Sequence, residues 1–253
     1  MIRMTKVSVL IGAVSMAAMG AAQASTTTFT FAQVSDTTNG SGALTFTNNG
    51  NGEGVLNTSN GAGEAVDFQF ESIANLPSSF NGQLNAVEYI NGGAGLTTTA
   101  AASTIAGFDE QTFNSAFTIS YMLAGTNTNL LTISIVPVNS SDSSLELLGS
   151  DGGGSTSGST SNYGAGSTGY SEVFSSDILS FTQLASLNAG FGLSAVSDYT
   201  VAADGLLNSF TGDPVFTFAS NPLPLYVPEP GSFALLGAGL LGLTFAARRR
   251  TAI

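Results

Sequence analysis

The chain has no histidine, no cysteine and no tryptophan, and lysine and arginine total only five of its 253 residues. Without histidine or cysteine it cannot form a His/Cys zinc site, a disulfide, or a nucleophilic triad in which histidine is the base. The absence of tryptophan removes the largest aromatic surface for stacking on a sugar ring. Core packing alone must therefore stabilise the folded chain, and several classes of enzyme are excluded.

The five basic residues lie only at the two ends of the chain: Arg3, Lys6, Arg248, Arg249 and Arg250. Of the 17 acidic residues only Glu229 lies outside the segment 25–227, which leaves that segment a formal charge of −16. A body with this charge repels phosphate groups, because nucleic-acid binding depends on lysine and arginine. We expect no nucleic-acid partner.

The N-terminal end has the three parts of a secretory signal peptide. Arg3 and Lys6 form the basic region, residues 7–19 are apolar, and Ala22-Gln23-Ala24 is an A-x-A cleavage site. The alternative, an N-terminal anchor helix, would need a longer apolar span without a small-residue exit. We predict that residues 1–24 are a signal peptide, with the Sec translocon and signal peptidase as partners and cleavage after Ala24.

The C-terminal end has a second set of targeting parts. Val227-Pro228-Glu229-Pro230-Gly231 precedes an apolar run at 232–247, and Arg248, Arg249 and Arg250 follow it. Sixteen helical residues rise about 24 Å, the short end of what spans a bilayer. The arginines favour the cytoplasmic side of the inner membrane, so we predict one C-terminal transmembrane helix with everything before Pro228 on the other side.

This order of motif, short apolar helix and basic cluster resembles the PEP-CTERM sorting tail of exported proteins of Gram-negative bacteria. The resemblance covers residues 227–250 and implies a processing enzyme, the exosortase, as a partner. It also implies a transient anchor in the inner membrane before passage to the cell surface or extracellular matrix. In that interpretation Val227, Pro228, Glu229, Pro230 and Gly231 are recognised by the exosortase and catalyse nothing.

The segment between the two ends has the pattern of β-strands. Val66 to Glu71 alternates apolar with polar residues, which places Val66, Phe68 and Phe70 on a buried face. Residues 113–123 and 131–135 alternate in the same way, and the polar connection 124–129 has the length of a hairpin turn. We predict an antiparallel hairpin here, ended by Pro137.

Further short strands are predicted at 28–34, 43–47, 87–90, 190–196, 199–202 and 215–219, separated by Asn- and Gly-rich turns. Many short strands favour an all-β fold, an antiparallel β-sandwich with a jelly roll as one form, in a single exported domain at 25–226. Two segments differ: 176–188 has apolar residues three apart and is predicted as a helix, and 150–169 is predicted as a flexible Gly/Ser loop within the domain.

Carboxylates in turn-rich loops supply the oxygen ligands that Ca²⁺ prefers, and the weak candidates are Asp109, Glu110, Asp142 and Asp151. None of them fits the spacing of a calcium-binding loop, so solvated surface charge is the favoured interpretation. No other cofactor is expected.

The first functional hypothesis is a non-enzymatic surface or biofilm-matrix protein associated with exopolysaccharide, as the family resemblance implies. The second is a lectin-like carbohydrate-binding module, with Tyr163 and Tyr170 as aromatic platforms. A glycoside hydrolase that uses two carboxylates is the third, but no motif marks such a pair. No catalytic residue is predicted.

Overall fold

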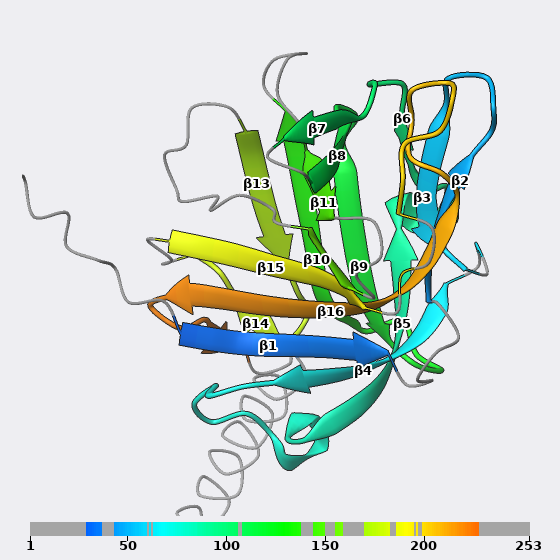
Figure 1. Cartoon of the computed structure of the whole chain (residues 1–253). Coiled ribbons are helices and arrows are strands. Elements are labelled where there is room, and N and C mark those ends of the chain that lie inside the picture. The colour runs from blue at the N-terminus through cyan, green and yellow to red at the C-terminus, as the bar shows by residue number, and fades with distance from the viewer. Residues whose placement is uncertain are drawn as a thin grey trace, which may run out of the picture.

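The computed structural model describes residues 29–36, 43–59, 61, 63–105, 108–137, 144–149, 155–158, 170–182, 186–194, 196 and 199–227. The described chain is all-β, with only two short 3₁₀ turns, η1 (Ser78–Phe80) and η2 (Asn91–Gly93) (Figure 1). The strands are β1 (Phe29–Asp36), β2 (Leu44–Asn48), β3 (Gly54–Thr58), β4 (Glu64–Phe70), β5 (Gln83–Ile90), β6 (Leu96–Thr98), β7 (Ser103–Ile105), β8 (Phe108–Phe113), β9 (Phe117–Leu123), β10 (Asn129–Pro137), β11 (Leu145–Gly149), β12 (Ser155–Gly158), β13 (Tyr170–Ser175), β14 (Leu179–Ser180), β15 (Ser186–Ser194), β16 (Phe210–Asn221) and β17 (Leu225–Tyr226).

Fifteen of these strands belong to one antiparallel, hydrogen-bonded sheet. Its path runs β13-β10-β9-β5-β4-β1-β16-β15-β12-β11-β8-β7, and β2, β3 and β6 branch from β16. The strands β14 and β17 form a separate two-stranded sheet. The prediction of an all-β antiparallel fold is therefore confirmed. The sandwich and its jelly-roll form stay predictions, because one path, not two separate sheets, connects the strands.

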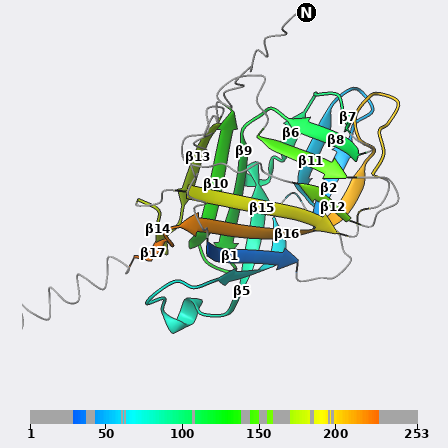
Figure 2. The ribbon, with the colours of Figure 1, turned by 60° about the vertical axis from the view of Figure 1, so that its left-hand side comes forward.

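The sheet bends so that two halves face each other across the core: one half contains β9, β10 and β13, and the other contains β1, β15 and β16. β9, β10 and β13 cross behind β1, β15 and β16 at a steep angle (Figures 1 and 2). Ring contacts join the halves: Phe31 of β1 lies 6.4 Å from Phe174 of β13, and Tyr121 of β9 lies 5.8 Å from Phe218 of β16, measured between ring centroids. Aromatic side chains therefore fill much of the space between the halves.

β16 is the longest strand and connects the parts of the sheet. Its burial alternates along its whole length, with Phe210, Phe216 and Phe218 on the buried face. It pairs with β1 and β15, and Phe210–Gly212 at its start also pairs with β2. β16 thus belongs both to the main path of the sheet and to the β2–β3–β6 branch.

The two strongest strand predictions are confirmed. β4 buries Val66, Phe68 and Phe70, as the alternation indicates. β9 and β10 form the predicted hairpin, with Ile119 opposite Ile133, and β10 ends at Pro137. The predicted turn between β2 and β3 is also present, with positive φ at Gly50 (71°) and Gly52 (82°), a conformation that glycine adopts without strain.

The helix predicted at 176–188 is wrong. Residues 179–180 form β14, and β15 begins at Ser186. Ser176 Oγ accepts hydrogen bonds from the N–H groups of Ile178 (2.9 Å) and Leu179 (3.1 Å), as a helix N-cap would, but the chain then becomes extended. Apolar residues three apart drift around a helix, so this spacing is a weak sign of one buried face.

Three smaller predictions also need correction. Four residues of the segment 150–169, Ser155–Gly158, form β12 between β11 and β15. Their backbone groups pair with both neighbours, which needs no apolar side chain. Phe113 belongs to β8, not to the hairpin. Residues 199–202 contribute only an isolated bridge, Val201 to Leu207.

Several predicted segments lie outside the described residues: the signal peptide 1–24 with Ala22 and Ala24, the tail from Pro228 to 253, and the remainder of the Gly/Ser segment. No helix in the described part of the chain is long and apolar enough to cross a membrane. The predicted span 232–247 belongs to the tail and stays a prediction, as does the single domain at 25–226.

Candidate functional site

A buried carboxyl group is the most unusual chemical feature of the core. Glu88 of β5 is fully buried, and its strand neighbours are Glu64 of β4 on one side and Tyr121 of β9 on the other. Within the described structure neither the Glu88 carboxylate oxygens nor Tyr121 Oη has a hydrogen bond of good geometry, although the Tyr121 hydroxyl lies close enough to favour the charged form of Glu88. Burying an unpaired carboxylate costs free energy, so the Glu88 carboxyl group is expected to keep its proton.

The surroundings of Glu88 favour this protonated form. Burial raises the pKa of the Glu88 carboxyl from its ordinary 4.5 to about 8; the nearby Tyr121 hydroxyl lowers it, while the charges of Glu64 and Asp36 raise it further. Burial, with the charge of Glu88, also raises the pKa of Tyr121 well above its ordinary value. Glu88 is closed from solvent, which argues for a structural rather than a catalytic carboxyl.

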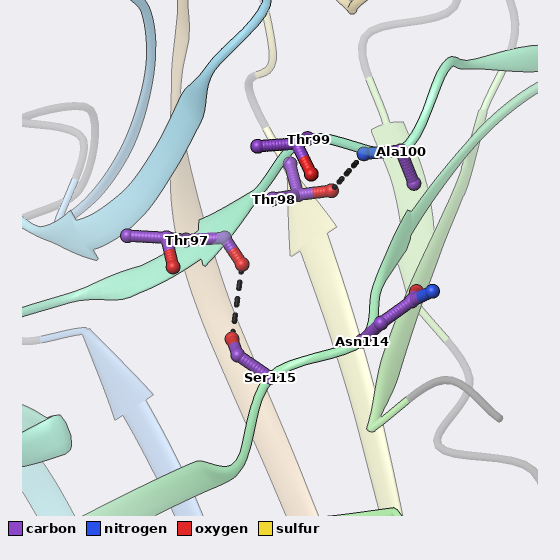
Figure 3. Close-up of a pocket in the computed structure, with 6 residues that line it drawn as sticks. All are labelled: Thr97, Thr98, Thr99, Ala100, Asn114 and Ser115. Carbon is purple, nitrogen blue, oxygen red and sulfur yellow. Dashed lines mark hydrogen bonds between the residues drawn. The ribbon is translucent and has the colours of Figure 1, made fainter. Parts of the chain in front are cut away.

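The surface has a small polar pocket between two loops (Figure 3). Thr97, Thr98 and Thr99 with Ala100, at the end of β6 and just after it, form one wall, and Asn114 with Ser115, between β8 and β9, forms the other. The pocket has a volume of about 260 Å³, and none of the described residues that line it is charged or aromatic. Ser115 Oγ donates a hydrogen bond to Thr97 O (3.0 Å), which holds the walls together.

A buried glutamine fixes this pocket from behind. Gln111 of β8 is fully buried; its Nε2 donates to Ala100 O (2.7 Å), and its Oε1 accepts from Leu207 N (3.3 Å). Thr98 Oγ1 donates to Thr112 O at 2.6 Å. The hydrogen bonds to Ala100 O and Thr112 O join residues 98–100 to β8, so the hydroxyl groups of the pocket lie on a rigid support.

A second hollow, of about 360 Å³, lies between the β2–β3 turn and the loop before β16. Asn48 Nδ2 donates to Asp204 Oδ1 (3.0 Å) and to Leu207 O (3.0 Å), and Gly50 N donates to Asn48 Oδ1 (2.8 Å). The hydrogen bond from Asn48 is the main reason why the pKa of Asp204 lies below its ordinary value. These contacts use most of the polar groups to close the loops on each other.

The calcium candidates do not gather at one place in the described structure. Asp109 and Glu110 are successive residues of β8, so their side chains leave opposite faces of the strand. Thr104 Oγ1 donates to Asp109 Oδ1 (2.7 Å), and Ser103 Oγ donates to Glu110 Oε2 (3.2 Å). Asp142 and Asp151 lie outside the described residues, within which no group of three or more acidic side chains could hold a metal ion.

The structure describes the backbone of only one of the two aromatic residues considered for stacking on sugars. Tyr163 lies outside the described residues, and Tyr170 is the first residue of β13. The sequence does not predict the polar pocket. Its two walls meet only in the folded chain, and no apolar pattern marks them.

The sorting motif begins where the described fold ends. Val227, its first residue, donates a backbone hydrogen bond to Ile178 O (2.9 Å), and 40% of its surface is exposed. Val227 follows β17 directly, at the edge of the small β14–β17 sheet near one end of β16 (Figure 2). Pro228, Glu229, Pro230 and Gly231, with Arg248, Arg249 and Arg250, lie beyond the described residues.

Comparison with known families identifies this tail. The family described as the PEP-CTERM protein-sorting motif matches residues 227–250, the span on which the sequence resemblance rests. No curated protein and no solved structure matches the chain. The match indicates an exported protein with a C-terminal sorting tail that is a substrate for exosortase.

Proposed function

Because the chain carries a PEP-CTERM protein-sorting motif at residues 227–250, we propose that it is a non-enzymatic surface or biofilm-matrix protein associated with exopolysaccharide. The motif is the observation that carries this proposal. In the proposed route the signal peptide directs export, residues 232–247 hold the chain briefly in the inner membrane, and exosortase passes the body to the cell surface or matrix.

The chemistry of the body supports a structural role. Residues 25–227 contain no histidine, cysteine, lysine or arginine, so this segment cannot use any of these four side chains in catalysis. Of the acidic residues, Glu88 and Glu64 lie directly opposite each other on neighbouring strands, but Glu88 is closed from solvent. A carboxylate pair that hydrolyses a glycosidic bond must reach the sugar from both sides. The acidic surface suits hydration and weak divalent bridging to anionic polysaccharide.

Replacement of Pro228, Glu229 and Pro230 by alanine is expected to abolish removal of the tail, because these residues form the recognised motif. Fractionation of the native host with mass mapping of both mature ends measures this. The wild type should appear at the surface or in the matrix without its tail, and the variant should stay with the membrane. Thr251→Ala, just outside the match, is the control. A wild-type chain recovered intact from the cytosol would contradict the proposal.

A second candidate is a lectin-like module, which the uncharged, hydroxyl-lined pocket of Figure 3 favours. Hydroxyl and amide groups on a rigid support can exchange hydrogen bonds with a neutral sugar. A lectin is expected to select a few sugars on a glycan array and to lose them in Asn114→Ala, while Thr47→Ala, at an exposed position of β2, keeps them. Uniform, unselective binding would favour the matrix role.

A further inference from the structure

The folded domain leaves no spacer before the sorting motif. Val227 is both the first residue of the matched motif and a backbone donor to Ile178 O within the fold. A processing enzyme must take hold of an extended peptide, usually through backbone groups on both sides of the processed bond. Residues just before the motif are therefore needed at the same time by the fold and by the enzyme.

We call Leu225–Val227 the strap. Its contacts with the domain are few: Tyr226 and Leu225 lie opposite Leu179 and Ser180 of β14, and Val227 adds the bond to Ile178 O. Leu225 is 57% exposed, and of the strap only Tyr226 packs partly against the core. A hollow of about 430 Å³ lies beside Val227, so this residue is not enclosed. Segments with few buried contacts open locally at a small fraction of the global unfolding cost.

The segment on which the strap lies is held much more firmly. Ser176 Oγ donates to Leu130 O (2.6 Å) and accepts from the N–H of Ile178. Asp177 N donates to Asn129 O (2.9 Å), and its Oδ2 accepts from Asn129 N (2.7 Å). These bonds fix residues 176–178 to the start of β10. When β17 separates from β14, the strap therefore moves and residues 176–178 stay in place.

We propose that the strap Leu225–Val227 must detach from β14 before the sorting tail is processed, so that the strap limits the access of exosortase to its substrate. The inference rests on the proposed function, since it assumes that the tail is processed. Cleavage that follows a fast local opening proceeds in proportion to the population of the open form. The rate of processing should then depend on contacts outside the motif.

The absence of cysteine allows a direct test in the full-length chain. Ser180 and Leu225 lie directly opposite in an antiparallel pair, where Cα atoms are about 4.5–5.5 Å apart, within the reach of a disulfide. Ser180→Cys combined with Leu225→Cys should form a bond that holds the strap closed. In the native host, tail removal is expected to become on the order of tenfold slower or more, and a reductant should restore it.

Three controls make the result specific. Each single cysteine variant should be processed like the wild type. Insertion of about eight Gly and Ser residues between Tyr226 and Val227, which leaves the matched motif whole, should restore processing of the linked form, because the inserted residues take the place of the strap in the enzyme. Equal processing of the linked form and the wild type would overturn the inference, as would a linked form that the insertion does not restore. Failure of the wild type to be processed would instead contradict the proposed function.

Discussion

Glu88→Gln is expected to remove a loss of stability that the wild-type protein shows as the pH rises from about 5 to 9. The folded protein holds the Glu88 proton with a pKa of about 8, whereas the unfolded chain releases it near the ordinary 4.5. Folding is therefore favoured most below pH 4.5, and the advantage is lost as the pH rises toward 8. The slope is about 1.4 kcal/mol per pH unit, on the order of 5 kcal/mol over the window.

Urea unfolding of the purified chain at several pH values measures this effect. The chain contains no histidine or cysteine, which ordinarily titrate in this range. The glutamine variant should have a nearly constant unfolding free energy from pH 5 to 9 and be the more stable form at pH 9. Asp67→Asn, on the outward side of β4, is the control and should keep the wild-type slope. The same slope in Glu88→Gln would show that another group is responsible.

Phe218→Ala is expected to lower the unfolding free energy by about 3–5 kcal/mol, since truncating a buried phenylalanine loses its transfer energy and leaves a cavity. Phe218 is fully buried, and its ring contacts Phe31 (6.4 Å), Tyr121 (5.8 Å) and Phe216 (6.1 Å) between centroids. It therefore supports both halves of the bent sheet. Small domains are commonly stable by only about 5–15 kcal/mol, and this one has no disulfide to add to that.

Phe29→Ala is the matched control, because Phe29 lies on β1 but is 51% exposed. It should cost well under half as much, since surface substitutions away from buried contacts change stability little. Far-ultraviolet circular dichroism during urea titration follows both variants. A Phe218→Ala protein as stable as Phe29→Ala would contradict the central place of this ring.

The sequence predicted best those strands that have one buried and one exposed face. β4, β9 and β10 from Leu131 to Ile135 alternate, because each has a core side and an outward side. In β16 the sequence predicted only 215–219, since Gly212, Asp213 and Pro214 interrupt the pattern. Those residues nevertheless continue the strand, because pairing with β15 and β2 supplies backbone hydrogen bonds.

The features that were missed depend on contacts between distant segments. β12 is formed by Ser, Thr and Gly without any apolar alternation, and it exists because β11 and β15 lie on either side. The strands at 87–90 and 113–123 were predicted, but only the pairing of β5 with β9 places Glu88 beside Tyr121. A glutamate in register with Ala86 and Ile90 was the available sign of its burial. The sorting tail is contiguous in sequence, so it could be recognised without the fold.

The pairing of β1 with β16 sets the order of events for an exported chain. The first described strand lies antiparallel to the long strand that ends at Asn221, shortly before the motif. Contacts between segments so far apart in the chain form late, because the intervening loop must be closed first. In the proposed export route, almost the whole body must therefore cross the membrane before the sheet can be completed. The topology thus delays the closing of the sheet until little more than the tail is left to follow.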